Sequence, residues 1–175
     1  EFRRVRFRSV GYTRVDKNDA YNAGVGHGFL SGGLHHRNRR VGNNLQRDFV
    51  FASGTMSFGV DVPDASYDVT VIMGDGRYTH EQIQLSIEDD VQVVVSQSGP
   101  ADFFTNTFAV SSSGGQMVFD WLDLGGPAPV VLINSIEIVQ SGSPENLTFT
   151  IDQAAISENG GASAATVTRS GSTVR

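Results

Sequence analysis

Apolar residues at every second position are the feature that most restricts the fold of this chain. Met56, Phe58, Val60 and Val62 alternate with small or polar residues. The same period of two recurs over 67–73, 83–87 and 132–138, where Asn134 interrupts it. Successive side chains of a β-strand point to opposite faces, so this period predicts half-buried antiparallel strands. Because such strands follow one another closely and no segment has a helical period, the sequence predicts an all-β antiparallel sandwich.

Turn residues separate the expected strands. Val62–Ser66 and Glu88–Asp90 predict tight turns, and Ser111–Gly115 divides a strand near Phe103–Val110 from one near Met117–Trp121. Residues 22–47 are instead rich in Gly, Asn, His and Arg. They predict long loops, and loops on a rigid sandwich often contain binding sites.

Composition changes near Val139 and predicts three parts. Residues 1–139 form the sandwich, and 140–146 form a linker because Ser, Gly and Pro predominate there. Residues 147–175 begin again with the strand-like segments 147–151 and 164–168. Two short strands do not form a core of their own, so this part is expected to pack on the sandwich, pair with another chain or open a further domain.

Charge is divided unevenly along the chain. Residues 1–47 contain ten basic and three acidic residues, a net charge of +7, whereas residues 48–175 contain three basic and sixteen acidic residues, a net charge of −13. The sequence pI of about 5.0 argues against a nucleic-acid-binding protein. No apolar run reaches the roughly 18 residues of a membrane span, and the absence of Cys excludes a disulfide framework and a thiol nucleophile.

Catalytic motifs are absent as well. The sequence has no Gly-x-Ser-x-Gly elbow, and His80-Glu81 lacks the second His of a zinc-protease helix. We therefore expect no enzyme activity. A structural Ca²⁺ remains an open alternative, since carboxylates are plentiful but show no EF-hand spacing and specify no ligand set.

Residues 1–139 resemble the galactose-binding-like β-sandwich domain found at the front of bacterial rhamnogalacturonan acetylesterases and attached to polysaccharide lyases. The matching stretches follow in order and are Gly11–Val15, Ala20-Tyr21, Gly26–Phe29, Arg47–Val50, Phe58–Asp64, Tyr67–Val71, Gly74-Asp75, His80-Glu81 and Ile133–Ile138. His27 departs from the aromatic residue more common in that family, and Glu1–Val10 lacks the usual Phe-Asp-Phe-Gly start. The resemblance implies a jelly-roll fold and an accessory, polysaccharide-contacting role.

Residues 147–175 resemble the opening of a Calx-beta repeat, with the match in Ser157–Gly161 and Thr166–Gly171. About the first third of such a repeat would be present. This resemblance implies an extracellular, modular parent protein.

Sugar-binding sites combine aromatic faces with planar polar groups, and Arg can bind carboxylate or sulfate with two parallel hydrogen bonds. On these grounds the expected carbohydrate-binding residues are Tyr12, Tyr21, His27, Arg37, Arg40, Arg47, Asp75, Tyr78, His80 and Trp121. Alternatives remain open for most of them. Trp121 can belong to the core, His80 can be structural, and the loop arginines, which also include Arg39, can pair with acids of the same chain.

The resulting hypothesis is a non-catalytic carbohydrate-binding module of a secreted or cell-surface bacterial protein. Its expected partner is a plant or algal polysaccharide, including acidic pectic or sulfated ones, with no nucleic acid, no membrane and no certain cofactor. We expect attachment to a catalytic or repeat domain. The competing hypothesis is a structural or adhesion spacer without a glycan site.

Overall fold

The computed structural model describes residues 12–97, 99–126, 129–141, 146–151 and 165–170, and every regular element among them is a β-strand. The chain divides into two compact units, residues 1–141 and 142–175. No helix in the described part of the chain is long and apolar enough to cross a membrane.

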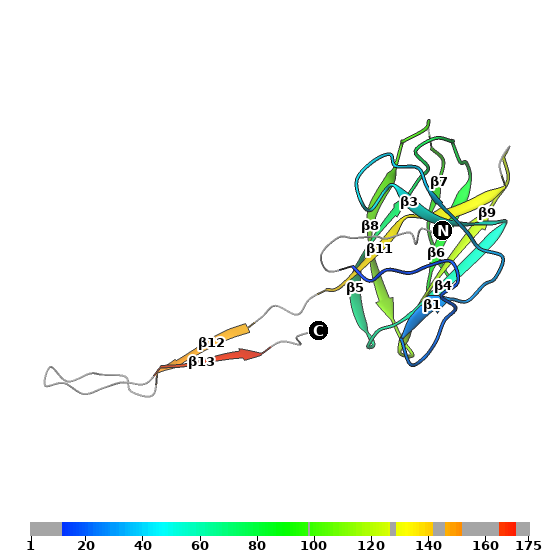
Figure 1. The fold of residues 1–175 in the computed structure, drawn as a ribbon. Coiled ribbons are helices and arrows are strands. Elements are labelled where there is room, and N and C mark those ends of the chain that lie inside the picture. Colours follow the sequence, from blue (N-terminus) through cyan, green and yellow to red (C-terminus); the bar gives the residue numbers. More distant parts are fainter. Residues whose placement is uncertain (1–11, 98, 127–128, 142–145, 152–164, 171–175) are drawn as a thin grey trace, which may run out of the picture. The chain divides into compact units, whose positions relative to one another are not determined.

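The first unit is an all-β antiparallel sandwich, as the alternating sequence predicts (Figure 1). One layer is a five-stranded sheet in which the central strand β9 pairs with β4 and β6. The order in this sheet is β1 (His27–Phe29), β4 (Thr55–Asp61), β9 (Gln116–Asp123), β6 (Ile83–Ile87) and β7 (Asp90–Val95).

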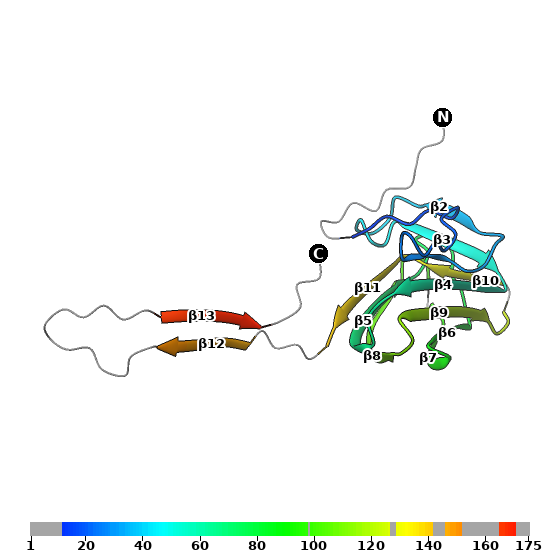
Figure 2. The same ribbon diagram turned by 90° about the horizontal axis from the view of Figure 1, so that it is seen from below.

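Two three-stranded sheets face this layer. One has the order β10 (Val130–Ile133), β3 (Asp48–Ser53) and β2 (His35–Asn38), and the other β11 (Ser135–Gln140), β5 (Ala65–Met73) and β8 (Phe104–Ser112). Only Asn134 separates β10 from β11, so one stretch of chain pairs first with β3 and then with β5. Figure 2 shows β2 and β3 on one side of β4 and β9.

The alternating apolar residues form the core. Met56, Phe119, Trp121 and Leu85 lie directly opposite or next to one another on β4, β9 and β6, and all are fully buried. Phe119 and Trp121 stack with their ring centroids 6.1 Å apart. Since burying one large apolar side chain contributes on the order of 2–3 kcal/mol, this cluster accounts for much of the stability of the sandwich.

The predicted turns lie where the sequence places them. Glu88 and Asp89 join β6 to β7 with φ of 54° and 64°. Two successive positive φ angles are the mark of a type I′ hairpin turn, whose twist matches that of the flanking strands.

Residues 22–47 differ from the expectation of long loops, because they contain the short strands β1 and β2. β1 pairs with β4 and β2 pairs with β3. Neither segment has a strand-like composition, so pairing with established neighbours decides their conformation rather than local propensity.

The second unit contains an antiparallel pair formed by β12 (Asn146–Ile151) and β13 (Ala165–Ser170). These strands correspond to the two strand-like segments of the sequence. The expected turn at Ser157–Gly161 and the atypical start at Glu1–Val10 lie outside the described residues.

Candidate functional site

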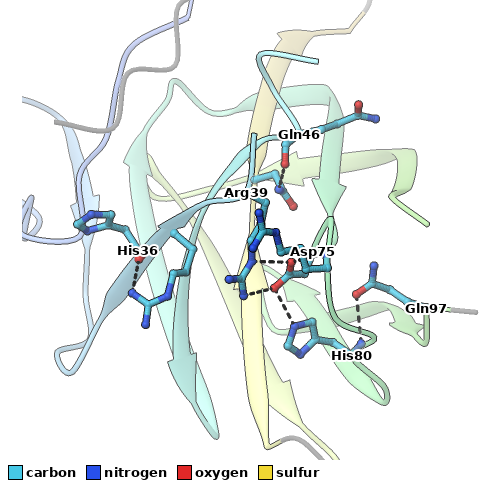
Figure 3. Close-up of polar contacts among 9 residues, drawn as sticks. His36, Arg39, Gln46, Asp75, His80 and Gln97 are labelled. Carbon is cyan, nitrogen blue, oxygen red and sulfur yellow. Dashed lines mark hydrogen bonds and ion pairs between the residues drawn. The ribbon is translucent and has the colours of Figure 1, made fainter. Parts of the chain in front are cut away.

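Asp75 is a buried carboxylate at the end of β5, with 1% of its surface exposed. Arg39 Nε donates to its Oδ1 and Arg39 Nη2 to its Oδ2, both at 2.8 Å, and the backbone N–H of Arg77 donates to Oδ1 at 2.9 Å (Figure 3). A Cβ on Gly76 would lie 2.6 Å from Val41 Cβ. The small residue beside Asp75 therefore lets the segment after β2 approach closely enough for Arg39 to reach the carboxylate.

His80 lies next to this pair, with its Nε2 3.5 Å from Asp75 Oδ2. Its backbone is fixed to Gln97, since the His80 N–H donates to Gln97 Oε1 at 3.2 Å and the Gln97 N–H donates to the His80 carbonyl at 2.9 Å. Burial alone would raise the pKa of Asp75, but the adjacent His80 imidazole and the hydrogen bonds from Arg39 and the Arg77 backbone together hold it well below its usual value. The 3.5 Å contact is long for a hydrogen bond, so we assign the larger part of this effect to the two 2.8 Å bonds from Arg39.

Arg39 connects the buried carboxylate to the surface. Its guanidinium carbon lies 4.9 Å from the ring centroid of Tyr78 and 5.5 Å from that of Phe49. Both distances are typical of cation–π contacts. The Tyr78 side chain is 60% exposed and yet rests against a cation that Asp75 holds in place.

The aromatic contacts continue along β2 and β3. Phe49 and Phe51 have ring centroids 5.8 Å apart, and His35 lies 5.2 Å from Phe51. Arg37 lies over Phe51 at 5.5 Å. His35 is opposite Phe51 and Arg37 is opposite Phe49 in the antiparallel register, so these side chains share one face of the sheet.

We call this side of β2 and β3 the aromatic–arginine face and define it as His35, Arg37, Arg39, Phe49, Phe51 and Tyr78. Phe49 is buried beneath Arg39 and is not itself accessible. The chemistry of this face is cationic, although the chain has a net charge of −6. Asp75 neutralises Arg39, whereas Arg37 is exposed and its Nη1 donates to a backbone carbonyl, that of His36, at 3.1 Å. The exposed Arg40 follows next in sequence. A planar ring beside an exposed guanidinium can contact the apolar side of a sugar and an anionic substituent together.

The expected binding residues near this face fall into two groups, exposed and buried. Arg37 and Tyr78 lie on the aromatic–arginine face, while Asp75 and His80 lie beneath it and are buried. The expectation that Asp75 and His80 contact a ligand is therefore corrected, since both side chains are buried. Asp75 holds Arg39, because a carboxylate removed from water must be paired, and His80 lies beside Asp75.

The expectation that Trp121 binds carbohydrate is contradicted by its burial. It is 1% exposed and stacks on Phe119 in the core, because its β9 position alternates with half-buried or exposed residues and faces the opposite layer. A ligand in solution does not reach it.

The remaining expected residues lie apart from the aromatic–arginine face. Tyr12 and His27 line a cavity between β1, β4 and β11, and the Tyr21 hydroxyl donates to Asp61 Oδ1 at 2.8 Å. Arg40 adopts a positive φ of 57°, and its N–H donates to Asn38 Oδ1. Arg47 is half-buried beside Asp48, whose pKa is raised by burial and lowered to a smaller extent by Arg47, Arg14 and His36.

Phe49 and Phe51 were not expected in the site. Phe49 is 2% exposed and Phe51 is half-buried, and their run with the buried Val50 is a strand signal that indicates a core rather than a surface. The pairing of β3 with the arginine-containing β2 brings them to the site, and that pairing is not visible in the sequence.

For metal binding, the described residues contain no group of three or more His, Asp or Glu side chains that could hold an ion.

Comparison with known proteins gives the fold alone. No protein-family model and no curated protein sequence matches the chain. Among solved structures, the protein YXIM of Bacillus subtilis is similar over 76% of this chain and 37% of its own, with 23% identity and a TM-score of 0.57.

Two further structures extend this likeness. The Bacteroides uniformis beta-glucuronidase 2 is similar over 65% of this chain and 14% of its own, with 15% identity and a TM-score of 0.51. The ANX2 ectodomain of Arabidopsis thaliana is similar over 64% of this chain and 41% of its own, with 10% identity and a TM-score of 0.53. The chain therefore spans less than half the length of each of these proteins, and what it shares with them is the β-sandwich.

Proposed function

We propose that the sandwich of residues 12–141 is a non-catalytic carbohydrate-binding module whose ligand is an acidic plant or algal polysaccharide. The observation that supports this is the Tyr78 ring, which is 60% exposed and lies against the guanidinium of Arg39, itself paired with Asp75. An aromatic ring fixed before binding loses little conformational freedom when a sugar stacks on it.

The second element of the proposal is charge. Arg37 presents an exposed guanidinium group at this surface, and a guanidinium can donate two parallel hydrogen bonds to a uronate carboxylate or a sulfate. In the same proposal the chain is a secreted bacterial domain of the galactose-binding-like class, attached to a catalytic domain or to Calx-beta-like repeats, with no nucleic acid or membrane as partner. A single module binds weakly, so the benefit would come from tethering its neighbour to the polysaccharide.

The test is affinity electrophoresis of the full chain in gels containing polygalacturonate, alginate, a sulfated galactan or a neutral galactan. We expect retardation by at least one acidic polysaccharide and a weaker effect of the neutral one. Tyr78→Ala should weaken binding by about tenfold or more, the effect typical of losing a central aromatic contact. Arg37→Gln should weaken binding of the acidic polymer alone.

Val25→Ala is the matched control, because Val25 is 63% exposed and lies in the loop before β1, outside the aromatic–arginine face. Retention of binding by Tyr78→Ala would remove that ring from the site.

The second candidate function is a structural or adhesion spacer. The burial of Trp121 and the internal pairing of Arg39 with Asp75 favour it. Absence of retardation on every polysaccharide would support the spacer and contradict the binding module.

A further inference from the structure

β8 is a sheet edge that lacks the features by which proteins usually protect such edges. It is the last strand of the sheet β11–β5–β8, and among the described residues it pairs with β5 alone. Its nine residues include no charged residue and no proline, and its register with β5 contains no bulge. Short length, charge, proline and bulges are the usual barriers to pairing with a further strand. The outer backbone groups of β8 are therefore open to another strand.

The other sheet edges described in the first unit do have such features. β7 contains a bulge and begins with Asp90, β2 contains Arg37, and β11 contains Glu137. β1 has three residues and β10 has four. Among the described strands of this unit, β8 is thus the edge best suited to accept a partner.

The sequence of β8 indicates which partner fits this edge. Residues 104–108 read Phe-Thr-Asn-Thr-Phe, which is the same in both directions about Asn106. In an antiparallel pair centred on Asn106, a second copy would place Phe104 opposite Phe108 and Thr105 opposite Thr107. Aromatic pairs and Thr pairs are among the favourable cross-strand neighbours of antiparallel sheets. A two-fold axis at Asn106 therefore makes each side chain of this segment meet one of its own kind.

The side chains of this segment are accessible to such a partner. Their opposite residues on β5 are all buried, so Phe104, Asn106 and Phe108 lie on the inner face of the sheet. Phe104 and Phe108 are nevertheless only half-buried, and Asn106 between them is exposed. The facing layer thus leaves this margin of the sheet uncovered, and a further strand would remove apolar surface of both rings from water.

We propose that two copies of this chain associate through β8, in an antiparallel pair centred on Asn106 that joins the two β11–β5–β8 sheets. The contact is small, so the dimer is weak and forms at high protein concentration. The proposal does not rest on polysaccharide binding, because β2 and β3 belong to another sheet. Each dimer would contain two aromatic–arginine faces, and two linked sites bind a polymer more tightly than one.

The test is sedimentation equilibrium of the full chain at concentrations up to about 1 mM, which detects even weak self-association. We expect a reversible equilibrium between monomer and dimer. Asn106→Lys should weaken the dimer by about tenfold or more, because it places like charges opposite each other at the two-fold axis. Ser111→Lys is the matched control, since Ser111 is exposed on the same strand and lies outside residues 104–108. Trp121 fluorescence checks that both variants fold.

The register of the pair has a separate readout, because the chain contains no Cys. Directly opposite residues of an antiparallel pair have Cα atoms about 4.5 or 5.5 Å apart, within the reach of a disulfide. In oxidised glutathione, Asn106→Cys should therefore form a disulfide-linked dimer much faster than Ser111→Cys. Four results would each overturn the proposal: a monomer at every concentration, an unchanged dimer in Asn106→Lys, larger assemblies in place of dimers, or equal cross-linking of the two Cys variants.

Discussion

Two buried carboxylates provide a matched test of the electrostatic argument. Asp75 and Asp48 are each 1% exposed, but Asp75 accepts two hydrogen bonds from Arg39 whereas Asp48 Oδ1 has no donor within the described residues. The perturbation is replacement of each residue by Asn, which keeps the shape of the side chain and removes its charge.

The expected magnitudes differ because the partners differ. Asp75→Asn leaves the Arg39 guanidinium, whose side chain is 18% exposed, without its counter-charge. Breaking one side of a buried pair typically lowers the free energy of unfolding by about 3–5 kcal/mol. For a unit of this size that corresponds to a decrease in Tm of about 10 °C. Asp48→Asn removes a charge whose burial is already unfavourable, so we expect a change of less than about 1 kcal/mol.

The contributions of the two carboxylates to the free energy of unfolding change with pH in opposite directions. The pKa of Asp75 is lower in the folded state than its ordinary value of 3.8, so its stabilising contribution is complete above about pH 5 and is lost progressively as the pH falls through 3.8 toward the folded pKa. The pKa of Asp48 is raised, so the folded state binds the extra proton and stability from this group decreases as the pH rises above 3.8. The difference between wild type and Asp75→Asn should therefore shrink in acid.

The assay is urea unfolding followed by tryptophan fluorescence between pH 2.5 and pH 7, since Trp121 is the single Trp and lies in the core. Equal losses of stability for Asp75→Asn and Asp48→Asn at pH 7, or a difference for Asp75→Asn that grows in acid, would refute the reasoning.

Two further substitutions test the packing. Trp121→Ala should lower the free energy of unfolding by about 3–5 kcal/mol by creating a cavity beside Phe119, and calorimetry should show this without any loss of polysaccharide affinity in the fraction that remains folded. Gly76→Ala should cost about 1–3 kcal/mol, because its Cβ would lie 2.6 Å from Val41 Cβ, whereas Gly32→Ala, whose Cβ meets nothing within 4 Å, should be neutral by the same measurement.

The strands were predictable because their signal is local. The period of two at 56–60 and 83–87 requires only that one face of each strand be buried, and the break at Asn134 is equally visible in the sequence. β1 and β2 were not predictable, since their backbone groups are satisfied by strands distant in sequence.

The candidate site was predictable only in part. Tyr78 and Arg37 could be identified as exposed residues of the right chemistry, but 41 positions separate them in the sequence. Their connection depends on the pairing of β2 with β3 and on Arg39 reaching Asp75. The burial of Trp121 depends on which of two strand faces points inward, and an alternating pattern flanked by acidic residues leaves that choice open.

Asn134 has one more consequence, for how the sequence of this sandwich can vary. Its N–H donates to the Ile72 carbonyl on β5, while its side chain donates to the carbonyls of Gln46 and Asp48. The joint between β10 and β11 is thereby tied to the partner strands of both, to β5 through the N–H and to β3 through the side chain. A one-residue insertion there would move Asn134 away from these acceptors and exchange the inward and outward side chains of one of the two strands. The length of this joint therefore keeps the inward faces of β10 and β11 in step with each other, and either strand is better lengthened at its far end.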